Sequence, residues 1–260
     1  MRVLMVGDII GKPGRRAVQQ LLPGLRHEYG LELVIANGEN AAGGLGITLD
    51  TAQELFDSGV DIITTGNHVW AQKEIIPYLE SDLSILRPLN FPPGAPGRGC
   101  LLTARALVVN LMGRVFMDEL DCPFRAMDRL LSEMTTATKV IIVDFHAEAT
   151  SEKMAMGRYL DGRVSAVLGT HTHVGTIDAC ILPEGTAYVT DVGMVGPMDS
   201  VIGDDVESVI HRFLSGMPHR ISVGKGKAIL NAVLVEVDET SGQATNIERI
   251  QRKEEQVDEG

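Results

Sequence analysis

The chain has 260 residues, of which 44% are hydrophobic, so it can bury one substantial core. Its formal net charge of −12 argues against a long nucleic acid as partner, although a small anion stays compatible because bound cations reverse the local potential. Three widely spaced cysteines, Cys100, Cys122 and Cys180, indicate neither a disulfide framework nor a cysteine-rich zinc site.

The same cysteine usage favours the reducing cytoplasm. The apolar run before Asp8 is too short for a signal peptide, and no apolar stretch approaches the roughly 18 residues that span a bilayer. We therefore expect a soluble cytoplasmic protein with no membrane partner. Assembly into a homo-oligomer is left open.

Strands and helices are predicted to alternate through the N-terminal third. Apolar runs at residues 3–6, 33–36 and 62–65 are typical of strands that are buried on both faces. Helical spacing of apolar residues predicts helices over residues 13–29, 48–58 and 70–79, the last with a kink or restart at Pro77. This repeat of strand, polar loop and helix predicts βαβ units with right-handed crossovers.

The rest of the chain is less regular. Residues 88–99 hold four prolines and three glycines and are expected to be loop, whereas residues 100–111 are typical of two paired strands. A helix over 123–137 precedes strands at 139–145 and 164–168, and short strands at 176–182 and 187–190 precede a hairpin of 227–237 with 244–250. We expect a single domain, residues 1–260, with a frayed charged tail at 251–260.

A polar cluster follows each of five apolar runs. The clusters are Gly7-Asp8, Gly38-Glu39-Asn40, Gly66-Asn67-His68, Phe145-His146 and Gly169-Thr170-His171-Thr172-His173. In open α/β sheets, ligands bind just beyond the carboxyl ends of the strands, so these five strand ends would build one site. Hard oxygens and imidazoles without a thiolate suit divalent metal ions.

Some of these residues also have a purely structural interpretation. Asp8 could cap the following helix, whereas a buried Glu39 is harder to explain in this way because an unpaired carboxylate is costly. Thr150 and Ser151 could cap a helix or line a phosphate pocket, and both alternatives stay open. The remaining histidines are interpreted as structural or solvated; they are His27, His211 and His219.

In this order the motifs resemble those of the calcineurin-like metallophosphoesterases, whose usual pattern is D-x-H, G-D, G-N-H-[DE], H and G-H-x-H. Two positions depart from it: Ile10 stands in place of a metal-binding histidine, and Glu39 in place of an aspartate. Together with residues 7–11 (GDIIG), 120–124 (LDCPF) and 190–194 (TDVGM), the chain resembles the bacterial YmdB-type branch over nearly its whole length. The resemblance implies a four-layer αββα sandwich, in which two mixed β-sheets are flanked by helices.

The resemblance also implies a centre of two divalent metal ions. The first ion would take Asp8, Glu39, Asn40 and His173, and the second Glu39, Asn67, His146 and His171. Glu39 would bridge the two ions, and the Asn40 carbonyl oxygen would replace the missing histidine. His68 follows a ligand and is the candidate general acid, or a stabiliser of charge on the phosphorus oxygens. Iron or manganese is favoured, and zinc also suits such ligands.

The branch is associated with hydrolysis of 2′,3′-cyclic nucleotides and other small phosphodiesters. The expected activity is therefore a metal-dependent phosphodiesterase that uses a metal-bridging hydroxide. A phosphomonoesterase or phosphoprotein phosphatase would use the same centre, and a non-catalytic metal-containing regulator or sensor is the alternative outside enzymes. A nuclease would need a basic groove, which the acidic charge disfavours. The sequence does not identify the residues that shape a nucleotide pocket.

Overall fold

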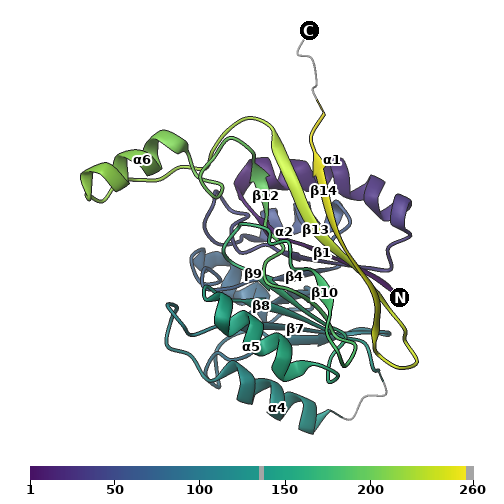
Figure 1. Ribbon diagram of the computed structural model, residues 1–260. Helices are drawn as coiled ribbons and strands as arrows, with labels where there is room; N and C mark the ends of the chain where they lie inside the picture. Colours follow the sequence, from purple (N-terminus) through teal and green to yellow (C-terminus); the bar gives the residue numbers. More distant parts are fainter. Residues whose placement is uncertain (135–137, 256–260) are drawn as a thin grey trace.

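Two β-sheets pack face to face in the computed structural model, which describes residues 1–134 and 138–255 (Figure 1). Helices cover the outer face of each sheet. The predicted four-layer αββα sandwich with two mixed sheets is therefore confirmed. No helix within the described ranges is both long and apolar enough to cross a bilayer.

The first sheet has the strand order β2-β12-β13-β1-β3-β4-β5, and β14 pairs with β13. Its strands are β1 (Arg2–Val6), β2 (Asp8–Ile9), β3 (Leu33–Asn37), β4 (Ile62–Thr64), β5 (Ile85–Leu86), β12 (Met194–Pro197), β13 (Ala228–Val237) and β14 (Ala244–Lys253). Strands β1, β3, β4 and β5 run parallel, whereas β13 is antiparallel to β1, β12 and β14. The sheet is thus mixed, and its parallel half carries the polar clusters at one edge.

The second sheet has the order β10-β11-β9-β8-β7-β6. Its strands are β6 (Cys100–Leu102), β7 (Leu107–Met112), β8 (Ile141–His146), β9 (Ala166–Thr170), β10 (Cys180–Ile181) and β11 (Ala187–Val189). Strands β7, β8, β9 and β11 are parallel, and antiparallel β6 and β10 lie at the edges. The parallel centre brings the end of β8 beside the end of β9.

The helices fall into two layers and one outlying element (Figure 1). The first sheet is covered by α1 (Gly11–Tyr29), α2 (Leu49–Asp57), the 3₁₀ turn η1 (Lys73–Ile75) and α3 (Ile76–Leu79). The second sheet is covered by α4 (Pro123–Glu133) and α5 (Thr150–Leu160). The remaining helix, α6 (Val206–Ser215), projects away from both layers.

Strand β1 shows why the apolar runs lack alternation. Its side chains point to opposite faces in turn, so Leu4 and Val6 join the core under α1, whereas Val3 and Met5 join the core between the sheets. Both faces are buried, and each position must therefore be apolar.

Several predicted elements match, and one helix is shorter than predicted. Helix α2 lies where it was predicted, because Thr48 and Thr51 form a capping box at its start. The helix predicted over 70–79 is reduced to η1 and the single turn α3. Pro77 lies in the first turn of α3, where its missing N–H costs least, so of the two alternatives at Pro77 the restart is confirmed and the kink is not.

The strand predicted at 176–182 is also shorter, with only Cys180–Ile181 paired. Thr176 and Asp178 instead hydrogen-bond the strand-end segment at Thr190 and Asp191, which removes them from the ladder. The tail was predicted to fray from residue 251, but β14 pairs through Lys253 with β13. Residues 135–137 of the predicted fourth helix and 256–260 of the tail lie outside the described residues.

Candidate metal centre

The structure brings all eight candidate side chains to one edge of the stacked sheets. Asp8 lies in β2, His146 ends β8, and the others follow β3, β4 and β9 within a few residues; they are Glu39, Asn40, Asn67, His68, His171 and His173. Asp8 does not cap α1, since the N-cap residue is Ile10 and no side chain caps that helix. The structural interpretation of Asp8 is therefore wrong.

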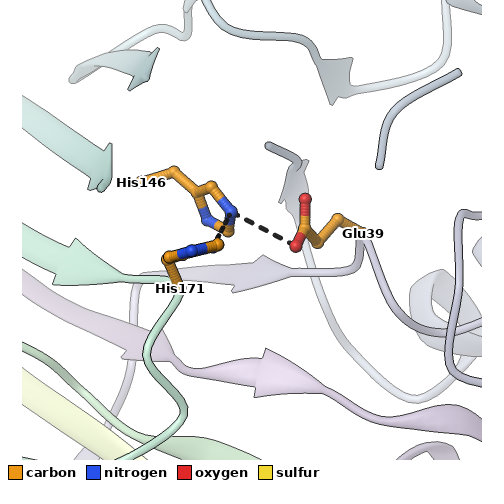
Figure 2. Close-up of side chains that lie close together, drawn as sticks. All are labelled: Glu39, His146 and His171. Atoms are coloured by element: carbon orange, nitrogen blue, oxygen red, sulfur yellow. Dashed lines mark hydrogen bonds and ion pairs between the residues drawn. The ribbon is translucent and has the colours of Figure 1, made fainter. Parts of the chain in front are cut away.

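His146 Nε2 faces three polar atoms at once. It lies 3.0 Å from Asn67 Oδ1, 3.0 Å from His171 Nδ1 and 3.2 Å from Glu39 Oε1. Figure 2 shows this convergence of Glu39, His146 and His171. One ring nitrogen offers either one proton or one lone pair, so it cannot satisfy all three neighbours. A shared cation between these atoms would satisfy them together, and the ligand atoms of Glu39, His146 and His171 all lie within 4.8 Å of one another.

In His171 and His173, the hydrogen-bond partner of the outer ring nitrogen determines which nitrogen carries the proton. Glu148 Oε2 lies 3.1 Å from His171 Nε2, and the Ile202 carbonyl oxygen lies 2.7 Å from His173 Nδ1. These oxygens only accept hydrogen bonds, so the outer nitrogen of each ring carries the proton. The inner nitrogens, His171 Nδ1 and His173 Nε2, are left with lone pairs that face the site.

The proton position on His146 is determined in the same way, here by the hydroxyl group of Thr170. Thr170 Oγ1 donates its proton to Asp144 Oδ1 at 2.7 Å, so it accepts the Nδ1 proton of His146 at 3.0 Å. In a neutral His146 ring the lone pair then lies on Nε2, directly opposite the lone pair of His171 Nδ1 at 3.0 Å. Two facing lone pairs repel each other unless a cation lies between them. The donor set therefore fits a metal ion.

A second group of atoms meets at Asp8. Among the described residues, Asp8 Oδ1 is buried without a hydrogen-bond partner, and it lies 3.9 Å from His173 Nε2. Asn40 Nδ2 lies 3.2 Å from Glu39 Oε1 and 3.3 Å from His173 Nε2. A buried carboxylate oxygen without a partner is costly, and a cation beside His173 would satisfy it. The residues proposed for the first ion thus also fit one.

Asn40 reaches this group with its amide nitrogen, while its oxygen lies 2.7 Å from His68 Nδ1. Metal binding requires the oxygen on the Glu39 side, which a half-turn of the amide provides without a change of shape. The same half-turn directs the NH₂ group at His68 Nδ1. Nδ1 would then accept a hydrogen bond, and the proton of a neutral His68 would lie on Nε2.

A protonated His146 offsets part of the negative charge at the site. Burial raises the pKa of Asp8 to about 6, and burial also opposes ionisation of Glu39, but the charge and hydrogen bond of His146 lower the pKa of Glu39 to about 2. Burial favours neutral His146, yet Glu39 and Asp8 raise its pKa to about 9. Burial and the His146 charge lower the pKa of His171 to about 3. The pocket thus holds one positive charge between two carboxylates, and a metal ion would replace that proton.

Backbone geometry explains how the ligands come so close. A Cβ atom on Gly66 would lie 2.2 Å from the His146 ring and 2.5 Å from Glu39 Oε2, so only glycine fits there. His171 and His173 adopt φ angles of 101° and 65°, which L-residues rarely occupy. Such strained residues persist only where their surroundings fix them.

The strained loop is fixed by a buried ion pair that the sequence did not identify. Asp191 Oδ2 accepts hydrogen bonds from the Thr172 backbone N–H at 3.1 Å and its hydroxyl at 2.8 Å, and from Lys153 Nζ at 2.7 Å. The His171 backbone N–H donates to Asp8 Oδ2 at 3.1 Å. In the sequence, the TDVGM segment that contains Asp191 stands out only because it carries the family resemblance. The structure shows that Asp191 holds the backbone and side chain of Thr172, between His171 and His173.

A cavity of about 330 Å³ opens beside this edge. Its lining includes His68, whose side chain is 35% exposed, together with Glu148, Ile202 and Asp204. The N-cap residue of α5 is Ala149 and no side chain caps this helix, so the capping alternative for Thr150 and Ser151 is wrong. Neither residue lines this cavity, and their role in binding phosphate stays a prediction. Ile10, which replaces a family histidine, is buried and forms part of the wall.

Comparisons with known proteins place the chain among relatives that match it over nearly its whole length. The family model described as YmdB-like protein matches residues 4–250. A 2′,3′-cyclic-nucleotide 2′-phosphodiesterase of Bacillus subtilis (strain 168) is 48% identical over 254 residues, which are 96% of this chain and 96% of that protein. A crystal structure of a hypothetical protein from Thermus thermophilus is 49% identical with a TM-score of 0.92, over 98% of this chain and 100% of that one. A crystal structure described as a novel phosphatase from Mycoplasma pneumoniae is 36% identical with a TM-score of 0.93, over 97% and 93%.

Proposed function

Because the chain belongs to the YmdB-like family, we propose that it is a dinuclear-metal-dependent phosphodiesterase whose preferred substrates are 2′,3′-cyclic nucleotides. The Bacillus subtilis relative is named for hydrolysis of such nucleotides, which supports the substrate class. The observation that carries the proposal is the approach of His146 Nε2 to 3.0 Å from His171 Nδ1 and 3.2 Å from Glu39 Oε1, which requires a cation, a proton or a metal ion, between these atoms.

The ligands divide into two sets that share Glu39. Asp8, Asn40 and His173 would hold the first ion, and Asn67, His146 and His171 the second, with iron or manganese favoured over zinc because oxygen ligands outnumber nitrogens. When bound, two such ions acidify water and neutralise charge on phosphate oxygens.

His68 would supply the proton that the leaving ribose oxygen needs. Its backbone N–H donates to Glu39 Oε2 at 3.1 Å and its Nδ1 contacts Asn40, which supports a fixed ring orientation beside the cavity. Within the described part of the chain, its Nε2 has no hydrogen bond, so this atom can face a substrate. If Asn40 binds metal through its oxygen, its NH₂ holds His68 in the form with the proton on Nε2.

The cavity favours diesters over monoesters. Glu148 and Asp204 add negative charge to its wall, and Glu148 is 48% exposed. A phosphomonoester carries up to two negative charges and a phosphodiester one, so the wall repels the monoester more strongly. This observation supports a phosphodiesterase more than a phosphomonoesterase or a phosphoprotein phosphatase on the same centre.

Hydrolysis of three compounds tests the proposal. We expect the manganese- or iron-loaded protein to turn over 2′,3′-cyclic AMP and bis-para-nitrophenyl phosphate faster than para-nitrophenyl phosphate, and to lose this activity in a chelator. Turnover that resists the chelator would contradict the metal-dependent mechanism. Tight nucleotide binding without turnover would instead identify a sensor.

A further inference from the structure

Helix α6 is poorly covered by the rest of its own chain. The structure describes all ten of its residues, and only Val209 among them is buried. Phe213 and Leu214 are 82% and 84% exposed, and Ile210 and Met217 are 49% and 64% exposed. Figure 1 shows α6 projecting from the body beyond β12. Large apolar side chains in this arrangement indicate a contact surface.

The sequence of α6 is nonetheless built for burial. Apolar residues recur with spacings of three and four along one stripe: Val206, Val209, Ile210, Phe213, Leu214 and Met217. Asp205 caps the start by accepting the Ser208 N–H, and Gly216 ends the helix at φ 66°. An isolated helix of this length is marginal in water, so the stripe needs a partner to pack against.

The charges along α6 indicate what that partner is. Asp205 precedes the helix as its N-cap, Glu207 lies in the first turn, and Arg212 lies in the last turn. In an antiparallel pair of α6 helices, the acidic start of one helix lies beside the basic end of the other. The two helix dipoles are then antiparallel, which also favours pairing. The surface is therefore complementary to itself, although the whole chain is acidic.

The exposed area is also of the right order. If a large apolar residue offers up to ~200 Å² when fully exposed, the exposed fractions of Ile210, Phe213, Leu214 and Met217 amount to on the order of 500 Å². A specific interface usually takes about 800 Å² from each partner. The stripe would supply most of that area, and its flanking residues the rest. A neighbouring apolar cavity of about 630 Å³, lined by Val201, Phe213 and Ile221, would be covered in the same contact.

We propose that two copies of this chain pair through their α6 helices, antiparallel about a twofold axis. The segment that joins β12 to α6 also forms part of the candidate site, because the Ile202 carbonyl accepts the His173 Nδ1 proton and Asp204 lines the cavity. Pairing would hold this wall of the cavity in place. Only this last step depends on the proposed function.

Light scattering during size-exclusion chromatography of the full chain tests the pairing directly. We expect the wild type to be a dimer and the Phe213→Ser, Leu214→Ser double variant to be a monomer. Phe116→Ser is the matched control, because Phe116 is 89% exposed but lies between β7 and α4, and it should stay dimeric. Circular dichroism should show that both variants remain folded. A monomeric wild type, an unchanged double variant, or a monomeric Phe116→Ser protein would each overturn the proposal.

Exchange of charges tests the antiparallel arrangement. Glu207→Arg places a basic residue in the first turn of α6 opposite the partner's Arg212, and Arg212→Glu makes both ends of the helix acidic, so each variant alone should dimerise at least several-fold more weakly than the wild type. Mixed in equal amounts, the two variants should form a heterodimer, which native mass spectrometry resolves. A mixture that stays monomeric would exclude this arrangement. Neither measurement depends on hydrolysis, so a failure of the pairing and a failure of the proposed function are distinguishable.

Discussion

The metal-site edge and helix α6 break the usual burial rule in opposite directions. At the edge, Asp8, Glu39 and His146 are at most 1% exposed, although charged groups are rarely buried. On α6, Phe213 and Leu214 are more than 80% exposed, although such side chains are normally buried. Each exception indicates a binding partner. The buried carboxylates and ring nitrogens of the edge would bind cations, and the exposed apolar stripe of α6 would pack against a second apolar surface.

The edge should be the more sensitive of the two regions, and Glu39→Gln is expected to have the largest effect. Glutamine keeps the shape but removes the charge that neutralises His146 and would bridge two ions. We expect hydrolysis at background level and fewer metal ions per chain by elemental analysis. Glu54→Gln is the matched control, because the Glu54 side chain is 56% exposed and, among the residues that the structure describes, its carboxylate pairs only with Arg15. Wild-type turnover in Glu39→Gln would exclude the shared-ligand site.

His68→Ala should separate chemistry from metal binding at the same edge. We expect metal content near the wild-type value and turnover lower by roughly 10²–10⁴, the usual contribution of a general acid. His27→Ala on the exposed face of α1 should change neither quantity. Unchanged turnover in His68→Ala would remove this residue from the mechanism.

Asn40→Ala should affect only one of the two ions. The variant loses the oxygen proposed for the ion beside Asp8 and His173, whereas Asn40→Asp retains an oxygen in the same place. We expect calorimetry to show one weakened site in Asn40→Ala, with affinity lower by about 10–100-fold, and two occupied sites in Asn40→Asp. Full occupancy of both sites in Asn40→Ala would contradict its role as a ligand.

The sequence predicted the location of this edge because local rules determine it. Parallel strands within one sheet carry their carboxyl ends to one side, so the polar residues after β3 and β4 meet in the first sheet and those at the ends of β8 and β9 meet in the second. The face-to-face packing of the two sheets then brings these two groups together. The supporting contacts were not predictable in this way. Lys153 and Asp191 lie 38 positions apart, and nothing near either residue indicates that it faces the other. The contact between Glu148 and His171 similarly depends on how α5 packs.

Secondary structure was predicted incorrectly where two local sequence signals favoured different conformations. Apolar spacing over residues 70–79 favoured a helix, but Pro77 allowed only a short turn to begin there. Thr176 and Asp178 have strand-like neighbours, yet their side chains hydrogen-bond Thr190 and Asp191 in place of a ladder. The stripe of α6 was present in the sequence, but only the structure shows that the body leaves it uncovered.

Phe145 beside the metal-site edge and Phe213 on α6 should differ strongly in what they contribute to the stability of a single chain. Phe145 in β8 is fully buried, so Phe145→Ala should lower the free energy of unfolding by about 3–5 kcal/mol through lost contacts and a cavity. Phe213→Ala removes the same group from an exposed site and should change it by no more than about 0.5 kcal/mol. Urea unfolding should be measured in chelator, at a protein concentration low enough to keep the chain monomeric, because metal binding and pairing both add stability. A loss of several kcal/mol in the Phe213→Ala monomer would mean that the stripe packs within its own chain, and the argument for an external partner would then fail.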